Sequence, residues 1–191
     1  MSVVANAIRT INSPSEANVR AAQVQMMIFD VDGVLTDGSL FFGADGEALK
    51  RFNVLDGLGI KLLQQAGIAI AIISARTSPI VSLRASDLGI THVHQGVHDK
   101  YAAFLALLNQ TSLKAMACGF IGDDIIDLPI LMGVGFAVSV PNGHHEVKSR
   151  VHYVTQASGG RGAAREVCDL ILRAQGKYNA ALTPYLNGAP A

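Results

Sequence analysis

The sequence predicts an α/β fold, a Rossmann-like arrangement with a mostly parallel sheet between layers of helices. Short runs of apolar residues alternate along the chain with stretches whose apolar residues recur at helical spacing. The apolar runs are continuous, which indicates strands that are buried on both faces. With 191 residues, half of them hydrophobic, the chain can bury one sizeable core, and no linker-like stretch divides it. We therefore expect a single domain over residues 1–191.

The expected elements follow one another in a regular order. Strands are expected at residues 24–29, 68–73, 90–93, 115–121 and 134–138. Helices are expected near residues 56–66, 78–87, 100–109, 124–132 and 162–175. Gly67, Gly89 and Gly133 stand where helices end. The last ten residues carry two prolines and a glycine, so we expect a loose tail over about 177–191.

A β-hairpin interrupts this alternation. Residues 39–42 and 48–52 flank the turn-forming segment Gly43-Ala44-Asp45-Gly46, which predicts a hairpin flap over about 38–52. This flap is too short to be a separate cap domain. Its apolar side chains would be poorly placed in water, so we expect some of them to be buried against another subunit; they are Phe41, Phe42, Leu49 and Phe52.

Composition excludes several classes of function. The 15 basic and 15 acidic side chains give a formal net charge of zero, and no basic run is present that would follow a nucleic-acid backbone. The apolar runs are far shorter than the roughly 20 residues that a membrane helix needs, and we expect a cytoplasmic protein. Cys118 and Cys168 form neither a metal-binding spacing nor a disulfide framework, so both should be buried thiols. The histidine pairs at 92/94 and 144/145 lack a third ligand and are predicted to be structural.

Two acidic clusters follow expected strands. Asp30 and Asp32 come directly after the first strand, and Asp123 and Asp124 follow the strand at 115–121. Ligands of an open parallel sheet bind beyond the carboxyl ends of its strands, so these acids could converge there. Carboxylates crowded together need a cation or a shared proton, and a set without Cys or His suits Mg²⁺. A metal site or a nucleophile with its acid/base partner is therefore predicted.

Phosphate-binding residue types stand between these clusters. Ser74 and Arg76 follow the strand at 68–73, and Lys100 opens the helix at 100–109. In isolation, such a serine is often a helix cap and such a lysine is often solvated. Asp124 and Asp127 have an alternative role as well, because acids are favoured at the start of a helix.

The four motifs, in this order, resemble those of the haloacid dehalogenase superfamily. They are D-x-D at Asp30, the serine at 74, the lysine at 100 and G-D-D at Gly122. Three further segments resemble one branch of it, the 3-deoxy-D-manno-octulosonate 8-phosphate phosphatases: F-N-V-L-D-G-L-G at 52–59, S-A-R at 74–76 and G-G-R-G-A-A-R-E at 159–166. The resemblance covers about residues 24–170. Ser74-Ala75 replaces the Thr-Gly common in the superfamily, which keeps the hydroxyl but adds a methyl group beside the phosphate site.

The resemblance implies Mg²⁺-dependent hydrolysis of this phosphomonoester through an aspartyl-phosphate, in the pathway that makes the octulosonate of lipopolysaccharide. Asp30 would be the nucleophile, and Asp32 would protonate the leaving sugar oxygen and then activate water. Ser74 and Lys100 would hold the phosphoryl oxygens. The metal would be bound by Asp30, the backbone carbonyl of Asp32 and Asp123. Asp124 and Asp127 would support the metal through water or orient Lys100.

The resemblance also implies where the sugar acid binds and how subunits assemble. Substrate contacts would come from Asp32, Asn53, Val54, Leu55, Asp56, Gly57, Arg76, Arg84 and Lys100. Members of the branch form homotetramers, with each site completed by a neighbouring subunit, and here Arg161 or Arg165 could arrive from a neighbour. Such assembly would replace a cap domain in excluding water from the site.

Two alternatives stay open at this point. A related nonulosonate 9-phosphate phosphatase would carry the same motifs. A catalytically silent assembly domain of this fold is the second alternative, although it would have no need to keep acids at 30, 32 and 123 together with Lys100.

Overall fold

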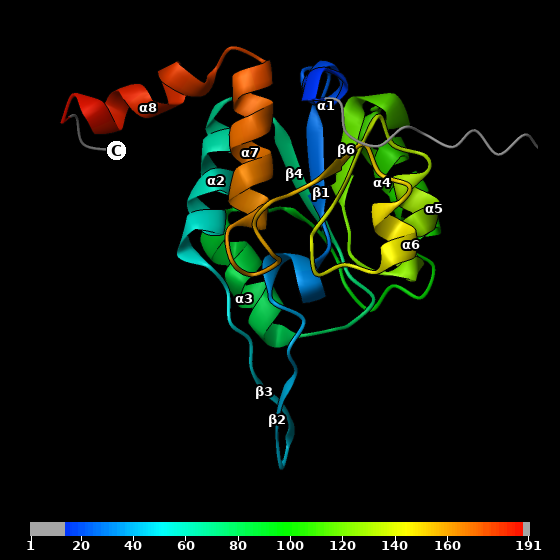
Figure 1. Ribbon diagram of the computed structural model, residues 1–191. Coiled ribbons are helices and arrows are strands. Elements are labelled where there is room, and N and C mark those ends of the chain that lie inside the picture. The colour runs from blue at the N-terminus through cyan, green and yellow to red at the C-terminus, as the bar shows by residue number, and fades with distance from the viewer. Residues whose placement is uncertain (1–13, 189–191) are drawn as a thin grey trace, which may run out of the picture.

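The computed structural model describes residues 14–188 and contains the predicted parallel sheet (Figure 1). Six strands lie in the order β5-β4-β1-β6-β7-β8, and all neighbouring pairs are parallel. Their bounds are β1 (Met26–Phe29), β4 (Ala69–Ile73), β5 (His92–His94), β6 (Cys118–Ile121), β7 (Phe136–Ser139) and β8 (Tyr153–Val154). The α/β fold class is thereby confirmed.

Helices cover both faces of the sheet. Buried residues of α1 (Pro14–Ala21), α2 (Val54–Gln65), α3 (Pro79–Leu88) and α7 (Ala163–Ala174) form one core cluster. Those of α4 (Lys100–Thr111), α5 (Leu128–Leu131) and α6 (His145–Lys148) form the other. Along β1, Met27 and Phe29 belong to the first cluster while Met26 and Ile28 belong to the second. This two-sided burial explains why the strand sequence is continuously apolar.

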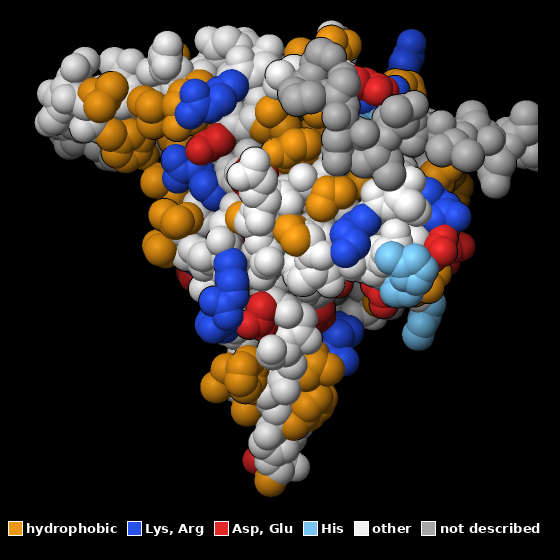
Figure 2. Space-filling view, in the orientation of Figure 1, with side chains coloured by type: hydrophobic (Ala, Val, Ile, Leu, Met, Phe, Trp, Pro, Cys, Tyr) orange, Lys and Arg blue, Asp and Glu red, His pale blue; other side chains and the backbone are white. Residues whose placement is uncertain are grey.

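The predicted hairpin is present and projects from the body of the molecule. Strands β2 (Phe41–Gly43) and β3 (Gly46–Leu49) pair antiparallel and extend away from the sheet (Figure 1). Hydrophobic side chains gather on this hairpin (Figure 2), and Phe42, the most exposed of its apolar residues, is 64% exposed. Phe52, just beyond it, instead packs against the core. Burial of the hairpin against another subunit stays a prediction.

Some expected elements are shorter than the pattern indicates. Residues 115–117 form a single 3₁₀ turn, so that β6 begins only at Cys118. The expected helix at 124–132 is divided into a 3₁₀ turn, Ile125–Asp127, and α5, in which Pro129 occupies an early position that suits its fixed φ angle. Four short or peripheral elements were not predicted: α1, α6, β8 and α8 (Tyr178–Leu186).

The C-terminal segment contains regular structure. Residues 178–186, within the segment expected to be a loose tail, form the helix α8 (Figure 1), and none of its residues is buried. A helix forms despite Pro184 and follows a break at Gly176, which has a positive φ angle. Cys118 and Cys168 are buried and unpaired, as expected. Within residues 14–188, every helix is too short or too polar to span a membrane.

Candidate active site

The two acidic clusters meet at one edge of the sheet. Strands β1 and β6 are neighbours with Phe29 opposite Ile121, and the N–H of Asp30 donates to the carbonyl of Ile121 at 3.1 Å. Asp30 therefore follows the end of β1 directly, and Asp123 stands two residues beyond the end of β6. The parallel pairing places both carboxylates at the carboxyl edge, as the sequence predicted.

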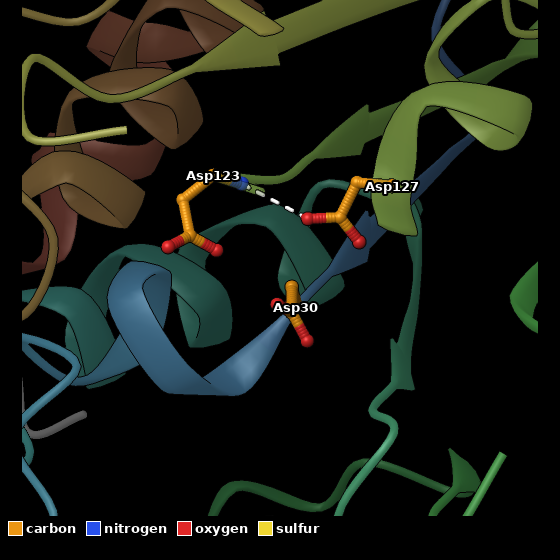
Figure 3. Close-up of side chains that lie close together, drawn as sticks. All are labelled: Asp30, Asp123 and Asp127. Carbon is orange, nitrogen blue, oxygen red and sulfur yellow. Dashed lines mark hydrogen bonds between the residues drawn. The ribbon is translucent and has the colours of Figure 1, made fainter. Parts of the chain in front are cut away.

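Three carboxylates form a compact group there. Ligand oxygens of Asp30, Asp123 and Asp127 lie within 4.8 Å of one another (Figure 3). Burial and the charge of Asp127 raise the pKa of Asp30 to about 8. Burial and the charges of Asp127 and Asp124 raise the pKa of Asp123 to about 7. The ionised acids therefore lack sufficient compensating charge from the protein, and this all-oxygen set fits a hard divalent cation.

Asp127 has a different role from the other two acids. One of its oxygens accepts a hydrogen bond from Lys100 Nζ at 2.7 Å. The other accepts the backbone N–H of Asp123 at 3.0 Å (Figure 3) and that of Asp124 at 3.2 Å. Because both oxygens are engaged, Asp30 and Asp123 are the carboxylates available to a metal. The contact with Lys100 agrees with one of the two roles expected for Asp124 and Asp127, and these two acids also form a capping box on the turn that follows.

Lys100 is buried beside the expected nucleophile. It opens α4, which Asp99 caps by accepting the N–H of Ala102 at 3.0 Å. Its Nζ lies 2.9 Å from Asp30 Oδ1. Burial alone would lower the pKa of Lys100, but Asp30 and Asp127 outweigh this effect and raise it. Lys100 is therefore a fixed cation at the site, and the alternative of a solvated lysine is wrong.

A glycine allows the turn after β1 to approach the second acidic cluster. Residues Val31–Leu35 form one irregular helical turn in which Gly33 has a φ angle of +93°. A Cβ atom on Gly33 would lie 2.0 Å from Asp123 Oδ2. Both the backbone conformation and this contact exclude a side chain here. The D-x-D-G sequence thus brings its own backbone against Asp123.

Asp32 points toward the hairpin instead of joining the carboxylate group. Its Oδ1 accepts a hydrogen bond from Lys50 Nζ, and its Oδ2 lies 3.7 Å from Arg76 Nε. Lys50 also lies 2.8 Å from Glu47 Oε1. Sequence reasoning missed Lys50 and Glu47, since charged residues of a hairpin are usually solvated and no motif marks them.

Ser74 stands at the same edge as Asp30. It follows β4, which pairs with β1 so that Ile72 lies opposite Phe29. The residue is buried, and its backbone N–H donates to the carbonyl of His94 at 2.8 Å. The topology thus brings together the three strand-end motifs and the lysine that the sequence placed far apart.

The expected substrate-binding segment begins α2. Asn53 caps this helix by accepting the N–H of Leu55 at 2.9 Å, and Val54 and Leu55 are exposed. The carboxylate of Asp56 accepts the N–H groups of Gly162 and Arg165 at 3.4 and 2.8 Å. Burial raises the pKa of Asp56. Its side chain therefore connects α2 to the start of α7, a structural role that the sequence did not indicate.

Two arginines lie beside this segment. The guanidinium of Arg84 stacks over Phe52 with its carbon 5.8 Å from the ring centre, and it leaves no space for a Cβ on Gly57. Arg165 pairs with Asp169 of its own helix at 2.8 Å. Arg84 therefore lies close to the residues expected to bind the sugar acid, and Arg165 has a partner within its own chain.

Known proteins resemble this chain in sequence over most of its length. A family model for haloacid dehalogenase-like hydrolases matches residues 71–166. The 3-deoxy-D-manno-octulosonate 8-phosphate phosphatase of Yersinia pestis is 47% identical over 162 residues, which cover 85% of this chain and 87% of the relative. The enzyme of the same name from Escherichia coli is 43% identical and covers 95% of this chain and 97% of its own length.

The chain belongs to the haloacid dehalogenase-like hydrolases, in the family of these phosphatases. A solved structure agrees with this membership. The Moraxella catarrhalis phosphatase of the same name, in complex with magnesium, phosphate and KDO, superposes with a TM-score of 0.87 at 40% identity. The match covers 90% of this chain and 98% of that one. In this chain, the four motifs of the family therefore lie at the carboxyl edge of the parallel sheet.

Proposed function

We propose that this protein hydrolyses 3-deoxy-D-manno-octulosonate 8-phosphate to the free sugar acid and inorganic phosphate. The observation that carries the proposal is the convergence of Asp30, Lys100 and Asp123 at the sheet edge of a chain 47% identical to a phosphatase of that name. A silent assembly domain would not require a buried lysine between two buried carboxylates. The reaction would supply the octulosonate used in lipopolysaccharide.

Asp30 acts as the nucleophile in this mechanism. One of its oxygens forms a bond to phosphorus while the bond from phosphorus to the sugar oxygen breaks, which gives an aspartyl-phosphate. Lys100 Nζ lies 2.9 Å from this carboxylate, where it can also contact phosphoryl oxygens, and Ser74 offers its hydroxyl from the neighbouring strand end. Both groups stabilise negative charge that spreads over the phosphoryl group.

Asp30, Asp123 and the backbone carbonyl of Asp32 would hold the cofactor Mg²⁺. The raised pKa values of Asp30, which is buried, and Asp123, which is half-buried, support this assignment, because two neighbouring acids that resist ionisation indicate a site built for added positive charge. Bound Mg²⁺ supplies that charge, favours the ionised carboxylates and attracts the anionic phosphate.

Asp32 acts as the general acid and then as the general base. It donates a proton to the leaving sugar oxygen, and in the second step it accepts a proton from the water that attacks phosphorus. That attack releases phosphate and restores Asp30. The carboxylate of Asp32 is separate from the metal-binding carboxylates, and its ion pair with Lys50 fixes its position.

The sugar acid would be bound by the start of α2 and by two arginines. Arg76 is 42% exposed at its side chain, and its ion pairs with Asp32 and Glu47 are long, 3.7 and 3.9 Å, so it can turn toward a substrate carboxylate. Arg84 lies against Gly57, and the further proposed contacts are Asn53, Val54, Leu55 and Asp56.

The protein would work as a cytoplasmic homotetramer. The exposed hairpin apolar residues Phe41, Phe42 and Leu49 support assembly, because a contiguous apolar ribbon is poorly suited to water. A neighbouring subunit would then cover the site, with Arg161 or Arg165 as the residues it could contribute.

Phosphate release tests the proposal. The protein is assayed with 3-deoxy-D-manno-octulosonate 8-phosphate, a nine-carbon sugar-acid 9-phosphate and an aryl phosphate, each with Mg²⁺ and with excess chelator. We expect Mg²⁺-dependent release with the highest kcat/KM for the eight-carbon substrate. A higher kcat/KM for the nine-carbon substrate would assign the related 9-phosphatase activity instead. No release from any substrate would favour the assembly domain.

A further inference from the structure

A network of four charged side chains lies at the base of the hairpin. Lys50 Nζ lies between the carboxylates of Asp32 and Glu47, and the Arg76 guanidinium lies within 4 Å of both acids. The side chain of Lys50 is 1% exposed, whereas that of Arg76 is 42% exposed. Lys50 is thus the buried member of the network, and the two acids and Arg76 around it are partly exposed.

Several elements hold this network in place. Glu47 accepts a hydrogen bond from the hydroxyl of Ser78, the residue before α3, and the backbone N–H of Ser78 donates to Gln95 Oε1 at 2.9 Å. Burial alone would raise the pKa of Glu47, but the hydrogen bonds from Lys50 and Ser78 lower it. Burial alone would lower the pKa of Lys50, but Asp32 and Glu47 raise it. Lys50 is therefore a stable cation with fixed partners.

This arrangement is hard to explain by stability alone. Replacing a buried ion pair by apolar groups of the same shape is often neutral for stability, or even stabilising. A lysine at this position fixes the orientation of the Asp32 side chain, because its ammonium group donates a hydrogen bond to a carboxylate that is otherwise partly exposed.

We propose that Lys50 is a positioning residue that holds Asp32 in the orientation needed for general acid–base catalysis, with Glu47 as the group that aims Lys50. The inference rests on the proposed function, in which Asp32 protonates the leaving oxygen. It makes the hairpin part of the chemical machinery, because the residue that fixes the acid belongs to the flap and not to the sheet.

A leaving-group comparison tests this role. Protonation matters greatly for a sugar alkoxide, which is a poor leaving group, and little for 4-nitrophenolate, which leaves readily as an anion. The ratio kcat/KM reports the first, phosphoryl-transfer half of the reaction and omits the later hydrolysis of the aspartyl-phosphate. For Lys50→Met we expect kcat/KM to fall roughly 10²-fold with the sugar-acid phosphate, and much less with 4-nitrophenyl phosphate.

A neighbouring residue provides the control. Arg51→Met removes a cation from the same segment, but Arg51 pairs with Asp37 and is 48% exposed. We expect this variant to keep the wild-type ratio between the two substrates. Glu47→Gln leaves Lys50 in place, and it should lower kcat/KM for the sugar-acid phosphate relative to 4-nitrophenyl phosphate by a smaller factor than Lys50→Met does. Circular dichroism shows whether Lys50→Met folds. If it does not fold, Glu47→Gln tests the positioning role in its place.

The outcomes separate this inference from the proposed function. If the wild type releases no phosphate from the sugar-acid phosphate, the proposed function fails and the inference fails with it. If the wild type is active but Lys50→Met loses the same factor of activity with both substrates, or keeps full activity with both, Lys50 does not position Asp32. The inference is then wrong and the proposed function stands. Selective loss with the sugar-acid phosphate supports it.

Discussion

The carboxyl edge of the sheet and the base of the hairpin both supply charged side chains to the candidate site, but they fix them in different ways. At the sheet edge, Asp30 follows a central strand and Lys100 opens a helix packed on the core. At the hairpin, Lys50 follows a two-stranded ribbon that projects from the body and exposes apolar side chains (Figures 1 and 2).

The two regions serve different parts of the proposed reaction: the sheet edge holds the nucleophile and the metal ligands, and the hairpin orients the acid–base group. The proposed nucleophile and metal ligands follow central strands that are packed on both faces, so their geometry is inseparable from folding. The acid–base group is oriented by a peripheral ribbon that contributes little to that core. Changes at the sheet edge should therefore affect stability and activity together, and changes in the hairpin should affect activity or assembly with less cost to stability.

The largest effect is expected from Asp30→Asn. The amide cannot form the aspartyl-phosphate, so phosphate release should fall by roughly 10⁴-fold or more. Asp45→Asn, at the exposed hairpin turn, is the matched control and should keep wild-type activity. Steady-state phosphate release measures both variants. Full turnover by Asp30→Asn would rule out the nucleophile assignment.

Lys100→Met tests whether the sheet edge is coupled to folding. It leaves Asp30 and Asp127 buried without their shared cation, and breaking a buried pair in this way costs about 3–5 kcal/mol in the free energy of unfolding. Urea denaturation at neutral pH with chelator present measures this loss. Lys61→Met on the exposed face of α2 should change stability by less than about 0.5 kcal/mol. Equal losses in the two variants would contradict the coupling.

The pH dependence of stability tests the carboxylate group itself. The folded-state pKa values of Asp30 and Asp123, about 8 and about 7, exceed the ordinary value of 3.8. At pH values between the ordinary pKa and the folded-state pKa, the folded protein therefore binds more protons than the unfolded chain. The metal-free protein should therefore lose stability as the pH rises from about 5 to about 8. Saturating Mg²⁺ should oppose this loss, because it binds the ionised acids.

Denaturation at a series of pH values, with chelator and with Mg²⁺, measures this effect. Asp123→Asn provides the control, since it removes one titrating group and should flatten the metal-free profile. A metal-free stability that increased over the same interval would show that these carboxylates are ionised without a cation.

The smallest effect on stability is expected at the hairpin tip. Phe42 is 64% exposed, so Phe42→Ser should change the free energy of unfolding of a subunit by no more than about 0.5 kcal/mol. It should nevertheless weaken assembly, which light scattering during size-exclusion chromatography measures. Met132→Ser, which removes a similarly exposed apolar side chain from a residue outside the hairpin, should leave the assembly intact. Equal assembly by both variants would exclude the hairpin as a subunit contact.

The sequence by itself determined the fold class and which residues gather at the candidate site. Continuous apolar runs require strands covered on both faces, and a parallel sheet brings the residues that follow those strands to one edge. Asp30, Ser74 and Asp123 could therefore be expected at that edge from their places after strands, whereas Lys100 was expected there from the resemblance of the four motifs.

Only the tertiary structure decided how the charges pair. From the sequence, Asp127 could have been an acid at the start of a helix or a partner that orients Lys100. It has both roles, because one oxygen accepts a hydrogen bond from Lys100 and the other accepts backbone N–H groups. Asp56 reaches α7, more than 100 residues away in the chain, and Lys50 reaches Asp32 across the hairpin. Such pairings depend on side-chain direction and distance between separate elements, which neither periodicity nor motif spacing encodes.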